Sequence, residues 1–201
     1  KRIGKKFLSP GPGFGGSCFK KDILNLVYLC HFYKLESVAN YWEQVLFIND
    51  WQKKRIASLI IEKFYGTVSN KAIIILGFSF KSNTNDTRES PSIKIAKDLI
   101  ENGAKLFIND PKVTNKQIEE EIGLEEFKND PDSSGSWSFT DDIVGASINA
   151  DAIVITFDGD NGIYDATDTL DETDASVIVD ASNITDTNDT VDVTATDIND
   201  D

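Results

Sequence analysis

Residues 71–80 read KAIIILGFSF. One lysine is followed by five apolar residues and then by Gly77. A short β-branched run that ends at a glycine is typical of a strand buried on both faces of a parallel sheet. We therefore predict a central strand here, and its carboxyl end is the edge where open α/β sheets bind ligands.

The chain after this strand alternates between helical and extended patterns. Ser90 and Pro91 are typical of a helix start, and the helical pattern ends at Gly103. Residues 104–111 then predict a second strand, which completes a βαβ unit. Fainter patterns predict helices at 114–123 and 141–150, a loop at 128–136, and strands at 150–157, 176–180 and 190–196. This alternation predicts an α/β fold with a Rossmann-like parallel sheet.

The residues before the central strand predict a helical segment. Residues 1–17 are rich in Gly, Pro and Ser and are expected to form a loop. Helical patterns follow at 19–34 and 35–65, and the second is long enough to link two domains. Its expected apolar stripe consists of Val38, Tyr41, Val45, Ile48, Trp51, Ile56, Ile60 and Phe64. We expect two domains, residues 1–68 and residues 69–201.

Charge is distributed unevenly along the 201 residues, whose net charge is −14. All 20 Lys and Arg residues lie in residues 1–128, together with 15 of the 34 Asp and Glu residues. The remaining 19 acidic residues lie in 129–201, without any basic residue. Such an acidic half repels nucleic acid and anionic membrane surfaces, so we expect neither as a partner. The basic half could receive a small anion.

Composition also indicates the cellular compartment in which the protein is expected. No run approaches the roughly 18 apolar residues of a membrane span, and the N-terminal residues have no apolar signal-peptide region. Two cysteines and one histidine give neither a disulfide framework nor a zinc pattern, so we expect no metal site. A reducing compartment, the cytoplasm, is the simpler expectation.

Residues 13–22 read GFGGSCFKKD and hold the strongest candidate for chemistry. Thiols beside lysines or at helix N-termini carry more of the reactive thiolate, and Cys18 has both features in prospect. The glycines at 13, 15 and 16 would let a bulky ligand approach the backbone. The alternative is that Cys18 is a small buried thiol beside a turn. Asp22, one helical turn later, is either an acid or base for that thiol or a partner of the helix dipole.

Other candidates are weaker. Residues 77–92 begin at the carboxyl end of the predicted strand, present Lys81 and Arg88, and end at a helix N-terminus, so they form either an anion-binding loop or a merely solvated one. Cys30 falls on an apolar helix face and is expected in the core. His31, next to it, is expected in the core or on the surface rather than in catalysis.

Three stretches together resemble the UDP-glucose dehydrogenases of the UDP-glucose/GDP-mannose dehydrogenase family. They are RIGKKFLSPGPGFGGSCFKKDILNLVYLC, the VANYWEQV and IND segment, and ILGFSFKSNTNDTRESPS with NGAKLFINDPKV, and they cover residues 1–113. The resemblance implies three parts: an N-terminal NAD-binding domain, a central helical dimerisation segment and a C-terminal Rossmann-like UDP-binding domain. We expect this chain to lack the first part, and so not to transfer hydride by itself.

The resemblance also implies roles for individual residues. Cys18 matches the nucleophile that forms a thiohemiacetal and then a thioester, and Asp22 matches the aspartate that helps to activate water. The cofactor, NAD, is expected to meet Cys18, Lys21 and Arg88. Substrate-binding positions, with Arg2 reaching the neighbouring subunit of a homodimer or larger homo-oligomer, are Arg2, Ser9, Gly13, Phe14, Gly15, Phe80 and Lys81.

The resemblance weakens after residue 113. Where the family has a substrate-binding Asp-Gly-Arg stretch, this chain has DASNITD, with Ala181 and Ser182 in place of the glycine and arginine. Two functions therefore stay open. One is part of an enzyme that oxidises UDP-glucose to UDP-glucuronate, or that oxidises another nucleotide sugar. The other is a non-catalytic module for nucleotide-sugar binding or dimerisation.

Overall fold

A computed structural model describes residues 11–81, 83–124, 126–127 and 135–156, and the backbone of 177–180. Its centre is a five-stranded sheet in the order β3-β2-β1-β4-β5. The predicted central strand is β1 (Ala72–Leu76), which pairs in parallel with β2 (Lys105–Asn109) on one side and with β4 (Ala152–Ile155) on the other. The predicted α/β fold is therefore confirmed.

The outer strands extend and modify this pattern. A short strand, β3 (Trp137–Phe139), continues the parallel sheet beyond β2, in a stretch after the expected loop 128–136 for which no strand was predicted. The last described strand, β5 (Val177–Asp180), pairs antiparallel with β4, so four strands and not all five are parallel. An apolar run predicts a buried strand but carries no sign of its direction. The edge strand predicted at 190–196 lies outside the described residues.

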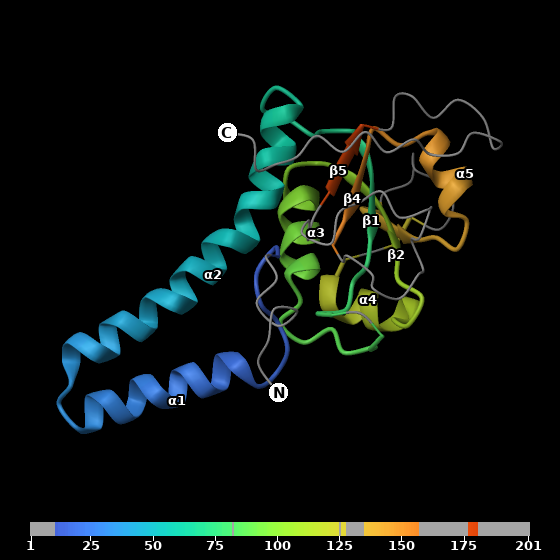
Figure 1. Ribbon diagram of the computed structural model, residues 1–201. Coiled ribbons are helices and arrows are strands. Elements are labelled where there is room, and N and C mark those ends of the chain that lie inside the picture. Colours follow the sequence, from blue (N-terminus) through green and yellow to red (C-terminus); the bar gives the residue numbers. More distant parts are fainter. Residues whose placement is uncertain (1–10, 82, 125, 128–134, 157–176, 181–201) are drawn as a thin grey trace.

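Helices cover both faces of the sheet (Figure 1). One face packs against α3 (Pro91–Glu101), α4 (Asn115–Ile122) and the second half of α2 (Glu36–Lys63), in a core that includes Ile60, Leu99 and Ile118. The other face packs against α5 (Ile143–Ile148) in a smaller core. The helix starts follow the sequence signals: Ser90 caps α3, and Thr114 with Gln117 forms a capping box on α4.

The two N-terminal helices form a hairpin that projects from the sheet (Figure 1). The first is α1 (Phe19–Phe32), whose buried side packs on α2, and the second half of α2 runs on to pack against α3. Both helices lie within a few residues of their predicted ranges. Within the described residues no helix is long and apolar enough to cross a membrane.

The predicted apolar stripe of α2 is right in its second half and wrong in its first. Ile56 and Ile60 are buried, whereas Tyr41 and Trp51 are 66% and 56% exposed. Ala39 and the polar Asn49 are buried in their place. The buried residues Ala39, Asn49, Lys53, Ile56 and Ile60 all follow one side of α2, which packs first on α1 and then on α3, and Tyr41 and Trp51 lie outside that side.

Candidate active site where the cysteine loop meets the sheet

The loop that follows β1 is fixed at its start by one buried carboxylate. Asp110, at the end of β2, accepts hydrogen bonds through Oδ2 from the backbone N–H groups of Phe78 (2.8 Å) and Ser79 (2.9 Å). Its other oxygen accepts the N–H groups of Lys112 (2.8 Å) and Val113 (3.1 Å). Asp110 thereby joins the carboxyl ends of two neighbouring parallel strands and fixes the backbone just before Phe80.

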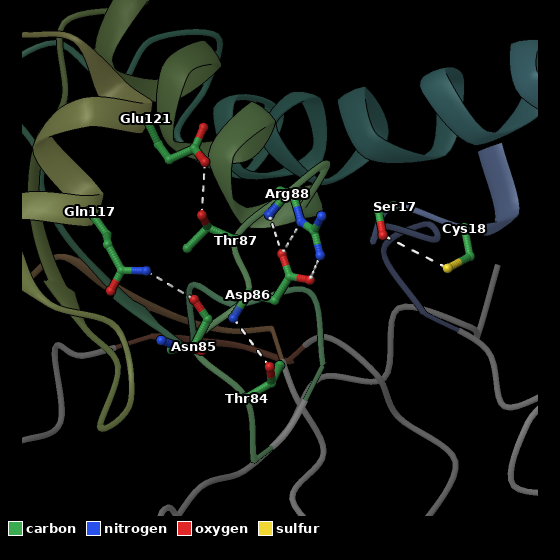
Figure 2. A network of polar contacts seen from close by, with 9 residues as sticks. All are labelled: Ser17, Cys18, Thr84, Asn85, Asp86, Thr87, Arg88, Gln117 and Glu121. Carbon is green, nitrogen blue, oxygen red and sulfur yellow. Dashed lines mark hydrogen bonds and ion pairs between the residues drawn. The ribbon is translucent and has the colours of Figure 1, made fainter. Parts of the chain in front are cut away.

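The far part of the same loop is held by α4, as Figure 2 shows. The hydroxyl of the buried Thr87 donates to Glu121 Oε1 (2.7 Å), and the side-chain amide of Gln117 donates to the carbonyl of Asn85 (3.1 Å). The loop is thus held in place at Asn85 and Thr87, while its charged side chains Lys81 and Arg88 are exposed to solvent. Anion binding by this loop stays a prediction.

The side chain of Arg88 on this loop is oriented by the carboxylate of Asp86 (Figure 2). Its Nε and Nη2 donate to the two carboxylate oxygens of Asp86 at 2.8 and 2.6 Å. The hydrogen bond from Arg88 lowers the pKa of Asp86, and Asp86 in turn raises the pKa of Arg88. The Arg88 side chain is 64% exposed, so Asp86 orients it and solvent still reaches it.

The cysteine loop, residues 11–18, lies directly on this loop, which we call the Arg88 loop. The N–H of Gly16 donates to the Arg88 carbonyl at 2.8 Å. A Cβ on Gly15 would lie 2.6 Å from the Glu89 carbonyl oxygen, and one on Gly16 would lie 2.8 Å from the Phe80 ring. Gly16 also has a φ of +78°, which other residues rarely adopt. The side-chain positions of these two glycines are therefore filled by protein, while the sequence had suggested room for a ligand.

Polar side chains of α2 bind the backbone of the cysteine loop. The carboxamide of Asn49 accepts the Phe14 N–H at 2.7 Å and donates to the Phe14 carbonyl at 3.1 Å. Gln52 donates to the Gly11 carbonyl at 3.1 Å. The Phe14 ring meets the edge of Phe19, with centroids 4.6 Å apart, which fixes the loop against the first turn of α1.

Cys18 is the N-cap residue of α1 and is exposed. The alternative of a buried thiol beside a turn is therefore wrong. Its carbonyl accepts the backbone N–H of Asp22 at 2.9 Å, and its sulfur lies 3.7 Å from the Ser17 hydroxyl oxygen (Figure 2). Cys30 is buried on the apolar face of α1, as predicted.

Opposite charges join the helices to the loops. Glu89 pairs with Lys20 of α1 at 2.8 Å and with Lys53 of α2 at 3.6 Å. The hydrogen bond from Lys20 and the charges of both lysines lower the pKa of Glu89. Burial lowers the pKa of Lys53, against the opposing effect of Glu89. His31 lies away from these groups and pairs with Glu36 at 2.7 Å on the exposed hairpin.

The structure brings together a large part of the predicted set. The cysteine loop packs against Phe80 and the Arg88 backbone, and Lys81 lies with its ammonium 5.3 Å from the centroid of its neighbour Phe80. Lys21 and Asp22 are exposed on the first turn of α1. Outside the described residues lie Arg2, Ser9, Ala181 and Ser182. Sequence reasoning missed three residues that hold these parts together, namely Asn49, Lys53 and Glu89.

Two family models match this chain. The central-domain model of the UDP-glucose/GDP-mannose dehydrogenase family matches residues 1–51. The UDP-binding-domain model of the same family matches residues 74–187, more than half of the chain. The chain belongs to the UDP-glucose/GDP-mannose dehydrogenase family. The family to which the motifs pointed is thereby confirmed.

Known members of the family are similar over part of their length. UDP-glucose 6-dehydrogenase of Gallus gallus is 49% identical over 160 residues, which are 80% of this chain and 32% of that protein. UDP-glucose 6-dehydrogenase 2 of Arabidopsis thaliana is 52% identical over 126 residues, 63% of this chain and 26% of that protein. A solved UDP-glucose dehydrogenase from Pyrobaculum islandicum is 29% identical, with a TM-score of 0.58 over 77% of this chain and 32% of that one. The chain thus spans about a quarter to a third of the length of these relatives.

Proposed function

We propose that this chain is the cysteine-bearing and nucleotide-sugar-binding part of an NAD-dependent dehydrogenase that oxidises C6 of UDP-glucose to the carboxylate of UDP-glucuronate. The observation that carries the proposal is the exposed Cys18 thiol, held at the start of α1 beside the ligand-binding edge of a parallel sheet. Family membership supports the reaction class, and the motifs around Cys18 favour UDP-glucose over another nucleotide sugar.

Cys18 would act on the aldehyde that the first loss of hydride leaves at C6. Its thiolate adds to the aldehyde carbon and the oxygen takes up a proton, which gives a thiohemiacetal. Loss of a second hydride from C6 and of the hydroxyl proton gives a thioester. Water then adds to the thioester carbon, the C–S bond breaks and the thiolate is restored. Asp22, one turn along α1, is our candidate to accept the proton of that water.

The described residues fit a dinucleotide cofactor at one point. A bound NAD would accept one hydride, so the two oxidations would use two NAD molecules in turn. An exposed guanidinium oriented by a carboxylate suits a diphosphate, which it can bind through two nitrogens, so Arg88 is the candidate for that contact. Lys21 is a second cation for the same ligand, on the first turn of α1 after Cys18.

The nucleotide sugar would lie along the cysteine loop. We assign it to the backbone of Gly13 and Gly15 and to Phe14, Phe80 and Lys81, with Arg2 and Ser9 as further contacts. The rigid loop and the lysine next to Phe80 support an anionic ligand with a flat base.

Both described cysteines are free thiols, which supports a reducing compartment, the cytoplasm. We also keep the predicted division into domains at residues 68 and 69.

The helical hairpin supports a second copy of this chain as partner. Large apolar side chains on α1 and α2 stand exposed in a single chain, which is unusual on a surface without a partner. They include Tyr28, Phe32, Tyr41, Phe47, Ile48 and Trp51. We propose a homodimer, or a larger homo-oligomer, built through this hairpin.

Capture of an aldehyde tests the proposal without any hydride transfer. The chain would be incubated with the C6 aldehyde of UDP-glucose, treated with iodoacetamide, and analysed by mass spectrometry for alkylation at Cys18 and Cys30. We expect the aldehyde to slow alkylation of Cys18 at least tenfold, because the thiohemiacetal has no free thiol. UDP-glucose, which lacks the carbonyl, is the matched control ligand. Equal alkylation with the two ligands would contradict a nucleophilic Cys18.

The non-catalytic module is the second candidate, because the exposed apolar side chains of the hairpin would also suit a dimerisation module. Calorimetry with UDP-glucose separates the two. A module binds UDP-glucose without capturing the aldehyde, whereas the proposed enzyme part does both. We expect no NAD reduction by the 201 residues alone with UDP-glucose, and turnover at rates typical of enzymes would contradict that expectation.

A further inference from the structure

A buried lysine lies where the cysteine loop, α2 and the Arg88 loop meet. Lys53 is 6% exposed, although its neighbour Lys54 on the same helix is exposed. Burial of an ammonium is unfavourable unless the charge is paired and hydrogen-bonded. The same side of α2 carries Ile56 and Ile60, so an apolar residue would satisfy packing alone. Packing alone therefore does not account for a lysine at this position, and its polar contacts must be considered.

The two ends of Lys53 contact two different parts of the candidate site. Its stem lies under the cysteine loop, because a Cβ on Gly13 would be 3.0 Å from Lys53 Cγ. Its ammonium donates to the backbone carbonyl of Glu89 at 3.1 Å and lies 3.6 Å from the Glu89 carboxylate. One side chain thus joins the backbone beside the proposed substrate to the residue that follows Arg88.

Glu89 in turn binds α1, the helix that begins next to Cys18. Its carboxylate accepts a hydrogen bond from Lys20 at 2.8 Å, and Lys20 is two residues after Cys18. The carbonyl of Arg88 accepts the Gly16 N–H, two residues before Cys18. Residues on both sides of Cys18 are therefore bound to the 88–89 backbone or carboxylate, and Lys53 holds that segment from α2.

We propose that Lys53 is a positioning residue, which sets the place of Cys18 relative to Arg88 by binding Glu89 while its stem supports the cysteine loop. It need not touch a reacting atom. The inference rests on the proposed function for its chemical meaning, but the contacts on which it depends are tested without substrate or cofactor. The ammonium is the essential part, because it makes two polar contacts that a carbon stem cannot make.

The test compares three variants of the full 201-residue chain. Lys53→Met keeps the stem and removes the ammonium, Lys53→Arg restores a cation, and Lys54→Met makes the same change at the exposed neighbour. Hydrogen exchange of the Gly16 amide reports the contact with Arg88, and exchange at Ile74 in β1 reports global stability. We expect exchange at Gly16 to rise at least tenfold in Lys53→Met, relative to Ile74, and to recover in Lys53→Arg. Lys54→Met should leave both amides unchanged.

The same variants are then tested for aldehyde capture. We expect Lys53→Met to lose at least fivefold of the Cys18 protection while UDP-glucose affinity, measured by calorimetry, changes less than twofold. A residue that serves stability alone would move Gly16 and Ile74 together, or would leave capture unchanged, and either result overturns the inference. Failure of capture in the unmodified chain would instead count against the proposed function, and exchange at Gly16 would then decide on Lys53 by itself.

Discussion

The sheet and the helical hairpin bury their apolar residues to very different extents. The strands and α3 carry side chains such as Ile74, Leu99 and Leu106 that are fully buried. The hairpin buries Ile23, Val27 and few others, and exposes most of its large side chains. The described sheet half therefore buries its apolar core within one chain, whereas the hairpin leaves apolar side chains exposed, and these are the ones that the proposed homo-oligomer would cover. The candidate site lies at the joint between them, where hydrogen bonds and ion pairs join the two parts.

The largest expected effect tests this difference in burial. Leu99→Ala removes a fully buried side chain from α3 and should lower the free energy of unfolding by about 3 kcal/mol. Leu24→Ala makes the same change on α1, where the side chain is 48% exposed, and should cost less than about 1 kcal/mol. Urea unfolding of both variants provides the measurement. Equal losses would show that the hairpin is as well packed as the sheet half.

The second prediction concerns the joint. Gly15→Ala places a Cβ 2.6 Å from the Glu89 carbonyl oxygen, so backbone must move, and we expect a cost of about 2 kcal/mol. Gly66→Ala is the control, because nothing lies within 4 Å of its Cβ. Its φ of +92° adds a strain of about 1 kcal/mol that is unrelated to the joint.

An NMR spectrum separates these two glycines more clearly than stability does. The amide signals of Phe80 and Glu89 should shift in Gly15→Ala and stay in place in Gly66→Ala. If the signals of Phe80 and Glu89 are unchanged in Gly15→Ala, the cysteine loop does not rest on the sheet half in solution.

This joint is also where sequence reasoning reached its limit. The period of apolar residues predicted β1, β2 and the long helices, and local signals at Ser90 and Gly103 marked where α3 starts and stops. Those signals are local, so one sequence contains them. The partners of Asn49 lie 35 residues away, at Phe14, and no local rule gives such a pairing.

The misread stripe on α2 has the same origin. Tyr41, Ile48 and Trp51 recur at helical spacing, and that spacing predicts a shared face but not what covers it. Here the face is exposed in the single chain, and the smaller Ala39 is buried against α1. Cys18 and Arg88 could be singled out from sequence because their chemistry is visible in the residue type. Lys53 could not, because Lys54 beside it has the same type and a different environment.

The third prediction tests what covers the exposed face. Tyr41→Ala removes a ring that is 66% exposed on α2, and we expect it to weaken self-association at least tenfold, because aromatic residues dominate interface energies. Tyr65→Ala is the matched control, since Tyr65 is fully exposed beyond the end of α2. Sedimentation velocity over a range of concentrations measures both. Identical association constants for the two variants would exclude this face of α2 from the interface.

The smallest expected effect concerns the ion pairs that join the two halves. The hydrogen bond from Lys20 holds the pKa of Glu89 below its ordinary value of 4.5. A carboxyl group whose pKa is lower in the folded chain stabilises that chain above the ordinary value and ceases to do so as the pH falls through the folded value. Since Glu89 is partly exposed, its contribution at pH 7 should stay below about 1 kcal/mol.

Glu89→Gln should therefore be less stable than the unmodified chain at pH 7, and the difference should disappear as the pH falls below 4.5. Glu62→Gln, at an exposed position on α2, is the control and should show no such convergence. Urea unfolding at several pH values between 7 and 3 gives both curves. A stability difference that stays constant with pH would mean that Glu89 joins the hairpin to the sheet through its shape rather than its charge. Its ion pairs with Lys20 and Lys53 would then contribute nothing to stability.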